Sequence, residues 1–197
     1  EENNASVDTN YNIIEKNIGT INRYSSDVTL NENSGTINTL SKGSVRKNTG
    51  KINDVNDKNV TIYNYAGGTV GKSDNAWGVR ACTVWNMGGI VQGYSSYADN
   101  VKVYNFEGGT VSNLRKGSVI YNLGGTVTDS STAQVINCYK VNINSSFVET
   151  WNNKFIINPD TGEVWLPEGE TGTFTVKDGT PQLYVTGATL TKQSDTA

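Results

Sequence analysis

The chain is patterned as a short repeat in which single apolar residues alternate with polar ones. The phrase Asn-x-Gly-Thr-Ile begins at Asn17 and Asn33, and a close variant begins at Asn48. Later copies, most with extra residues at the turn, cover residues 64–70, 86–91, 105–111 and 122–127, with a degraded copy at 137–141. Self-similarity at so short a period predicts a solenoid built from stacked coils.

Other apolar positions recur in step with this phrase. A second apolar phrase precedes most of the leading Asn residues, as Val28-x-Leu30, Val60-x-Ile62, Cys82-x-Val84, Val101-x-Val103 and Ser118-x-Ile120. A third apolar position follows in the next turn, at Tyr24, Leu40, Val55 and Leu114. Period-two alternation over short runs predicts strands with one buried face. We therefore predict an all-β fold, a single-stranded parallel β-helix (β-solenoid) of about eight short coils, each with two main strands and a shorter third side.

Stacking places equivalent residues in columns. Coils share backbone hydrogen bonds at a spacing of about 4.8 Å, so one coil's side chain lies directly over the next. The leading Asn residues then form a structural ladder in which side-chain amides bond one another: Asn33, Asn48, Asn64, Asn86, Asn105 and Asn122. We interpret this ladder and the Gly residues that follow it as corner chemistry, because Asn tolerates and Gly favours left-handed backbone.

The two ends of the chain lack the repeat. Residues 1–11 are polar, and we expect an N-terminal arm or cap before a solenoid over 12–143. Over residues 144–197 the pattern changes to short strands separated by turn signals such as Pro167-Glu-Gly169. This segment predicts a β-rich C-terminal cap that closes the open end of the solenoid; a truncated piece of a following domain is the alternative.

Composition excludes several classes of function. Charged residues make up 18% of the chain, the net charge is −3, and no Lys/Arg cluster exceeds Arg115-Lys116, so we expect no nucleic-acid partner. No apolar run has transmembrane length, so we expect no membrane insertion. The chain has no histidine, which removes Ser-His-Asp catalysis and His-ligated metals, and its two cysteines are too few for a four-thiolate zinc site. We expect no metal and no cofactor.

An aromatic column is the first candidate for a binding site. The residue before the ladder Asn is Tyr63, Trp85, Tyr104 and Tyr121 in successive coils. Because their strand neighbours are apolar and face inward, these four side chains are predicted to face outward. One interpretation is a stripe of flat faces for sugar rings. The alternative is that the rings stack on each other and stiffen the coil.

The longest insertions lie in the middle coils, over residues 71–81 and 92–100, and form the second candidate. They contain Trp77, Tyr94, Tyr97, Asp74 and Asp99. Loops that bulge from a regular scaffold are where binding residues concentrate, so the three aromatic residues are predicted to build a pocket near the column. Ordinary loop expansion is the alternative.

Two further functions, catalysis and ice binding, each require a residue pattern of their own. A carbohydrate-active enzyme needs paired carboxylates or a positioned base, and Asp74, Asp99 and Glu107 lie in neighbouring coils near Arg80 and Lys102. They form no local catalytic motif, so we predict no catalytic residues and keep an enzyme as the alternative. Ice-binding solenoids carry unbroken Thr-x-Thr arrays, whereas here residues such as Lys51, Ile90 and Lys140 interrupt the outward Thr columns.

The cysteines test the register of the repeat. Cys82 and Cys138 fall in different columns three coils apart, which is roughly 14 Å along the stack by strand spacing. A disulfide needs Cα atoms within about 7 Å. We therefore predict two free, buried thiols.

The Asn-x-Gly-Thr-Ile/Val phrase over residues 12–143 resembles the β-solenoid repeats of bacterial surface and adhesin-like proteins, especially large secreted proteins of gut bacteria. The resemblance implies an extracellular location, secreted or attached to the cell surface. It carries over no catalytic residues. We expect a non-catalytic surface module that binds a glycan or a host or cell-surface protein through the aromatic stripe and the middle-coil loops, with a carbohydrate-active β-helix enzyme (polysaccharide lyase or glycosidase type) or a purely structural spacer as alternatives.

Overall fold

The computed structural model describes residues 1–10, 14–72, 78–93, 98–145, 148–176 and 182–195. Every regular element within these ranges is a β-strand. The chain folds as two units, Glu1–Val135 and Ile136–Ala197, and each is described by itself. The described residues contain no helix long and apolar enough to cross a membrane.

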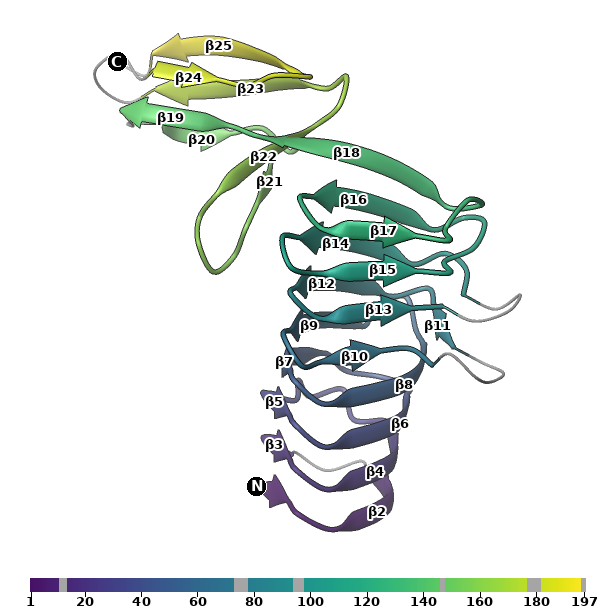
Figure 1. The fold of residues 1–197 in the computed structure, drawn as a ribbon. Helices are drawn as coiled ribbons and strands as arrows, with labels where there is room; N and C mark the ends of the chain where they lie inside the picture. The colour runs from purple at the N-terminus through teal and green to yellow at the C-terminus, as the bar shows by residue number, and fades with distance from the viewer. Residues whose placement is uncertain (11–13, 73–77, 94–97, 146–147, 177–181, 196–197) are drawn as a thin grey trace. The chain divides into compact units, whose positions relative to one another are not determined.

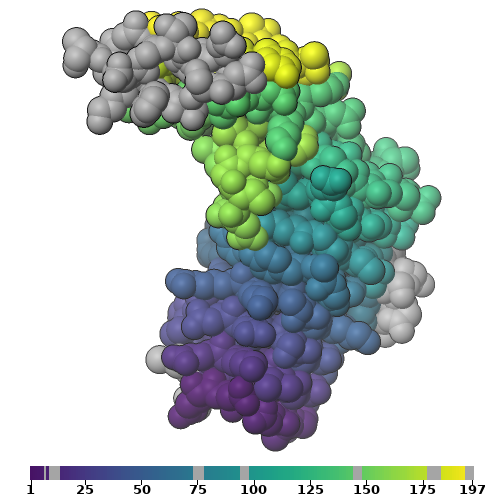
Figure 2. All heavy atoms as spheres, turned by 60° about the vertical axis from the view of Figure 1, so that its left-hand side comes forward, coloured from purple at the N-terminus to yellow at the C-terminus, as the bar shows by residue number. Residues whose placement is uncertain are grey.

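The first unit is a β-solenoid in which the chain winds through parallel strands (Figure 1). Its first side consists of β1 (Glu2–Asn3), β3 (Lys16–Asn17), β5 (Glu32–Asn33), β7 (Val45–Asn48), β9 (Thr61–Tyr65), β12 (Thr83–Met87), β14 (Lys102–Phe106) and β16 (Val119–Leu123). Its second side consists of β2 (Ser6–Asn10), β4 (Thr20–Tyr24), β6 (Thr36–Leu40), β8 (Lys51–Asn56), β10 (Thr69–Val70), β13 (Ile90–Gln92), β15 (Thr110–Ser112) and β17 (Thr126–Thr128). Figure 2 shows the first coils as successive bands from purple to blue, because the coils stack in the order of the sequence.

The shorter third side is where β4, β6 and β8 end and where β11 (Val79–Arg80) pairs with β8. Its inward residues are the predicted third apolar positions Tyr24, Leu40 and Val55, which are fully buried and stack in register. Together with inward Ile and Val residues of the other two sides they form one continuous core. The predicted all-β, parallel solenoid is confirmed.

The predicted Asn ladder is present and longer than the repeat indicated. Each Nδ2 donates to the Oδ1 of the next coil, from Asn3 through Asn17 and Asn33 up to Asn122, at 2.7–2.8 Å for most steps and 3.3 Å for the last. We call these eight residues the inner ladder. From Asn17 to Asn105 its members are fully buried inside the first side. None of them has positive φ, so the expectation that the ladder Asn supplies left-handed backbone is wrong. Each lies in a strand of the first side, at its last or second-last residue.

The corner after the inner ladder uses glycine in two ways. At Gly35 the backbone is ordinary, but a Cβ would lie 2.1 Å from the Gly19 carbonyl oxygen of the coil below. Glycine is needed there for close approach of two backbones. Later coils carry two glycines. Gly67 has φ of 89°, and a Cβ there would make only an ordinary contact, 3.5 Å from the Thr49 carbonyl oxygen, whereas a Cβ on Gly68 would lie 2.4 Å from the Asn48 carbonyl oxygen. The inserted glycine supplies the turn, and the second keeps the close approach.

Three details differ from the sequence expectations. Residues 1–11 are predicted to form an arm or cap, and the described part of that segment, residues 1–10, supplies β1 and β2, which pair in register with β3 and β4. This adds a coil ahead of the first one predicted, and the solenoid as a whole has about ten turns, slightly more than the eight or so predicted. Val28 was predicted to face inward but is 39% exposed, because it lies in a bend where strand alternation does not apply, whereas Leu30, two residues later, is fully buried.

The second unit has strands that are mostly antiparallel. They are β18 (Gln134–Lys140), which begins in the first unit, β19 (Asn142–Ser145), β20 (Val148–Trp151), β21 (Ile156–Ile157), β22 (Val164–Pro167), β23 (Thr171–Val176), β24 (Gln182–Tyr184) and β25 (Thr189–Asp195). β22 lies between β18 and β21, and β23 lies between β20 and β25. A small core forms around Phe155, Val164 and Leu166. Because β18 pairs with β22, the second unit begins before residue 144, the predicted start of the cap.

The two cysteines are free and buried, as predicted. Burial raises the pKa of the Cys82 thiol to about 12, and that of Cys138 likewise to about 12. Both therefore stay protonated at neutral pH, and neither is a reactive nucleophile.

Candidate functional site

The aromatic column forms in the predicted register. Pairing of β9, β12, β14 and β16 places four rings over one another: Tyr63, Trp85, Tyr104 and Tyr121. Their strand neighbours, such as Ile62 and Val84, are fully buried, whereas all four aromatic residues are half-buried and face outward. The strand alternation that fills the core thus sets the column on the outside of the first side.

The rings of the column stack on each other. The centroids of Trp85 and Tyr104 lie 4.2 Å apart with 27° between the ring planes, and those of Tyr104 and Tyr121 lie 5.2 Å apart with 15° between the planes. Tyr63 stacks on Trp85 at 6.1 Å and 14°. Parallel rings this close cannot lie side by side in one plane, so their faces turn toward one another and their edges toward solvent. The column offers ring edges to a partner; flat faces are available only at its ends.

The middle-coil candidates are only partly placed. Trp77, Tyr94, Tyr97 and Asp74 lie outside the described residues, so the pocket predicted for them stays a prediction. Asp99 is described, and its Oδ1 lies 3.4 Å from Arg80 Nε in an ion pair whose side chains are 38% and 30% exposed. The structure therefore joins Asp99 to the third side through Arg80.

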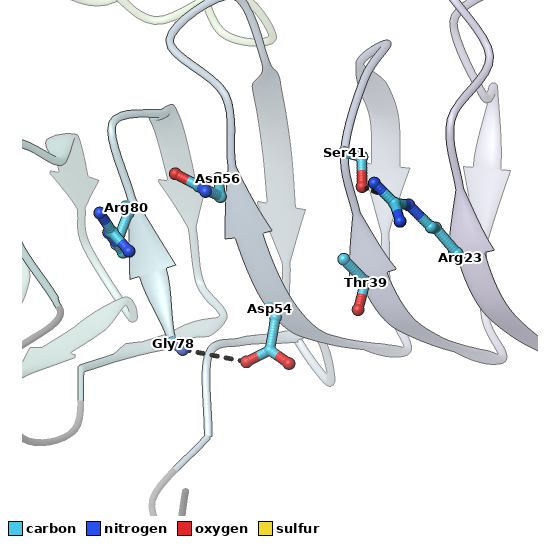
Figure 3. A pocket seen from close by; sticks show the side chains of 7 residues that line it. All are labelled: Arg23, Thr39, Ser41, Asp54, Asn56, Gly78 and Arg80. Atoms are coloured by element: carbon cyan, nitrogen blue, oxygen red, sulfur yellow. Dashed lines mark hydrogen bonds between the residues drawn. The ribbon is translucent and has the colours of Figure 1, made fainter. Parts of the chain in front are cut away.

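The third side carries a polar groove of about 590 Å³ that the sequence analysis did not predict (Figure 3). We call it the third-side groove, and it is lined by Arg23, Thr39, Ser41, Asp54, Asn56, Gly78 and Arg80. Register explains the set: Arg23, Thr39 and Asp54 are adjacent in β4, β6 and β8, each just before a buried third-side residue. Outward side chains of four successive coils thus meet on one surface.

Hydrogen bonds hold the groove's charged side chains in place. Arg23 Nε donates to Ser41 Oγ at 3.1 Å, and the Gly78 backbone N–H donates to Asp54 Oδ1 at 2.9 Å (Figure 3). Burial raises the pKa of the Asp54 carboxyl, while the Gly78 hydrogen bond and the charge of Lys72 act in the opposite direction. The carboxylate is therefore partly desolvated and still faces the groove.

Chemistry that would indicate catalysis is limited in the described part of the chain. No group of three or more Cys, Asp or Glu side chains there is arranged to hold a metal ion. Of the predicted acidic trio, Asp99 is ion-paired and Glu107 is exposed on a turn. Asp54 is the carboxylate among the groove's lining residues.

A signal for the groove was present in the sequence. The residues just before Tyr24, Leu40 and Val55 must face outward if those three face inward, and they are Arg23, Thr39 and Asp54.

Comparison with protein-family models, with curated proteins and with solved structures found no match to this chain.

Proposed function

We propose that this chain is a non-catalytic surface module of the adhesin-like type, located outside the cell, that binds a glycan or a protein partner through the aromatic column and the adjoining middle coils. The observation that carries the proposal is the column itself: four half-buried aromatic residues in register on the outer face of a stacked scaffold. The resemblance of the repeat to bacterial surface solenoids supports the location.

The column suits recognition for two physical reasons. Tyr and Trp provide large contact areas with few rotatable bonds, so little conformational entropy is lost when a partner binds. The rings are also preorganised, because each is stacked on its neighbour at 4.2–6.1 Å and is carried by a strand with a fully buried neighbour. Preorganisation reduces the cost of binding. The outward ring edges contact C–H groups, and phenol hydroxyls exchange hydrogen bonds with polar groups of the partner.

A structural spacer is the second candidate, and the ring stacking favours it. Trp85 turns its faces to Tyr63 and Tyr104, so much of its surface already stabilises the stack. A spacer needs only this stiffness and no ligand. The two candidates predict different results when a ring is truncated: a binding module loses affinity for its partner, whereas a spacer shows no change in binding.

Binding of the full chain to an array of plant, microbial and host glycans, and to host surface proteins, tests the proposal with Trp85→Ala and Tyr104→Ala. Tyr184→Ala is the matched control, because Tyr184 is 55% exposed on the second unit. We expect the two column variants to lose at least about tenfold in affinity, the cost of one interface aromatic, while the control keeps its affinity. Equal binding by all variants that remain folded makes the column structural and favours the spacer.

A further inference from the structure

The third-side groove and the aromatic column carry different chemistry on different sides of the solenoid. The column is aromatic, and its rings contact each other. The groove has no aromatic residue among its lining side chains; it presents hydroxyl, amide, carboxylate and guanidinium groups from four successive coils. The same strand alternation that buries Tyr24, Leu40 and Val55 turns these polar groups outward. The groove therefore has its own binding chemistry.

Charge in the groove is arranged along the stack. Arg23 lies at one end, on β4, and Arg80 lies at the other, on β11, with Asp54 of β8 between them. Three coil steps separate the two arginines, which is roughly 14 Å at a strand spacing of about 4.8 Å. Thr39, Ser41 and Asn56 fill the space between the charges. Along the stack the order is the Arg23 cation, then neutral polar groups with the Asp54 acceptor, then the Arg80 cation, whose charge is paired with Asp99.

The groove's polar groups are oriented before any ligand arrives. Ser41 Oγ accepts from Arg23 Nε, which uses one of the five N–H donors of that guanidinium and fixes its direction. Asp99 holds Arg80 from the other end, at 3.4 Å from Nε. The Gly78 N–H occupies Asp54 Oδ1 and so fixes the plane of the carboxylate. Preorganised donors and acceptors bind a ligand at lower entropic cost.

We propose that the third-side groove binds an acidic oligosaccharide lying along the solenoid axis. A sugar carboxylate contacts the Arg23 guanidinium, whose fork geometry matches a carboxylate. Sugar hydroxyls between the two arginines donate to Asp54 and exchange hydrogen bonds with Asn56 and Thr39. The proposal does not depend on the aromatic column, which lies on another side.

The central acceptor is what favours a sugar over an acidic peptide. Asp54 is an ionised group that accepts hydrogen bonds, so it repels a closely spaced row of carboxylates. A glycan chain presents hydroxyl donors between its acidic groups and satisfies the carboxylate. The groove also lacks an apolar side chain among its lining residues to anchor a peptide.

Binding of the intact chain to oligogalacturonate, sialylated oligosaccharides and sulfated glycosaminoglycan fragments, measured by calorimetry at low and high salt, tests the proposal. The methyl ester of oligogalacturonate serves as the neutral analogue and oligoglutamate as the acidic peptide. We expect a carboxylate-bearing glycan to bind, binding to weaken with salt, and Arg23→Ala to reduce affinity by about tenfold, as expected for loss of one charge-assisted hydrogen bond.

Arg46→Ala is the matched control, because Arg46 is exposed on β7 and its removal changes the net charge by the same amount. It is expected to bind as the unmodified chain does. Three results each overturn the proposal: no acidic glycan binds, Arg46→Ala loses as much affinity as Arg23→Ala, or the ester or oligoglutamate binds as tightly as the acidic glycan. Loss of binding in Arg23→Ala with no loss in Trp85→Ala separates this groove from the aromatic column.

Discussion

Two ladders of side-chain amides run along the solenoid, one buried and one part-buried. The inner ladder lies inside the first side, where Asn33, Asn48 and Asn64 are fully buried. The second, which we call the outer ladder, lies on the second side: Asn53 donates to Asn38, Asn38 to Asn22, and Asn22 to the Asp8 carboxylate, at 2.7–2.8 Å. The inner ladder donates toward the C-terminus and the outer ladder toward the N-terminus.

The same hydrogen bond has different consequences in these two places. A buried amide that loses its partner has no water to replace it and pays the full desolvation cost, whereas an exposed one exchanges its partner for water. Inner-ladder amides also bond the backbone: Asn48 Nδ2 donates to Gly50 O at 3.3 Å and Thr69 O at 3.4 Å as well as to Asn64. We infer that the inner ladder fixes the register of the coils, and that the outer ladder forms because that register is already set.

The largest loss of stability is expected at the glycine corner after the inner ladder, where the backbones of two coils approach most closely. A Cβ introduced by Gly35→Ala lies 2.1 Å from the Gly19 oxygen, and the coils must separate to admit it. We expect a loss of about 4 kcal/mol in the free energy of unfolding, at the upper end for overpacking. Urea unfolding measures it. Gly67→Ala is the control, because φ there is 89° but the Cβ would lie 3.5 Å from the Thr49 oxygen, an ordinary contact; it should lose only about 1–2 kcal/mol through backbone strain. Equal losses would refute close approach as the reason for Gly35.

Removal of one inner-ladder amide is the next largest change. In Asn64→Ala, Asn48 Nδ2 loses its acceptor and Asn86 Oδ1 loses its donor, both in the buried core. We expect a loss of about 2–4 kcal/mol, because Asn86 Oδ1 and Ile90 O lose a buried donor and Asn48 Nδ2 keeps only its longer bonds to the backbone. The same unfolding measurement applies, and labelling of the Cys82 thiol reports whether the core opens. A loss below about 1 kcal/mol would show that the ladder is not what holds the register.

The inner ladder was predictable because its signal is repeated. Asn leads the phrase at nearly every coil, and the Ile or Val that follows sets the face. The outer ladder was missed because the outward positions beside each inward Ile or Val were weighed only as a threonine array, although Asn22, Asn38 and Asn53 recur there. Asn3 was missed because its coil lacks the Gly-Thr-Ile phrase, although it donates to Asn17 as later members do.

The candidate sites were predictable to different degrees for a physical reason. The strand register alone determines which residues share the aromatic column, so the alignment of Tyr63, Trp85, Tyr104 and Tyr121 on adjacent coils was predicted correctly. Ring orientation depends on side-chain torsions, which register does not determine, and so the stacking of faces was left open between two interpretations. The third-side groove brings Arg23 and Arg80 together across an insertion of irregular length, and no fixed spacing in the sequence relates them.

The outer ladder supplies the direct counterpart to Asn64→Ala. In Asn38→Ala, Asn53 loses an acceptor and Asn22 loses a donor, as in the inner ladder, but these side chains are only part-buried. We expect a loss of about 0.5 kcal/mol, since water takes over both partners. Urea unfolding of both variants under one condition decides the comparison. If Asn38→Ala costs as much as Asn64→Ala, burial is not what separates the ladders.

The smallest expected effect is a gain in stability, and it concerns a part-buried carboxylate, Asp54. Burial raises the pKa of Asp54 above its usual value of 3.8, so the folded state disfavours the charged form. The resulting contribution to stability is present below pH 3.8 and is lost as the pH rises through the raised pKa. Asp54→Asn should therefore stabilise the fold at pH 7, by less than about 0.5 kcal/mol after solvent screening, and the gain should vanish near pH 3.

Urea unfolding at both pH values measures this change in stability, with Asp57→Asn as the control on an adjoining turn. A destabilised Asp54→Asn at pH 7 would mean that the Gly78 hydrogen bond outweighs desolvation. A carboxylate that costs stability while facing the groove is what a binding surface, as opposed to a spacer, is expected to carry.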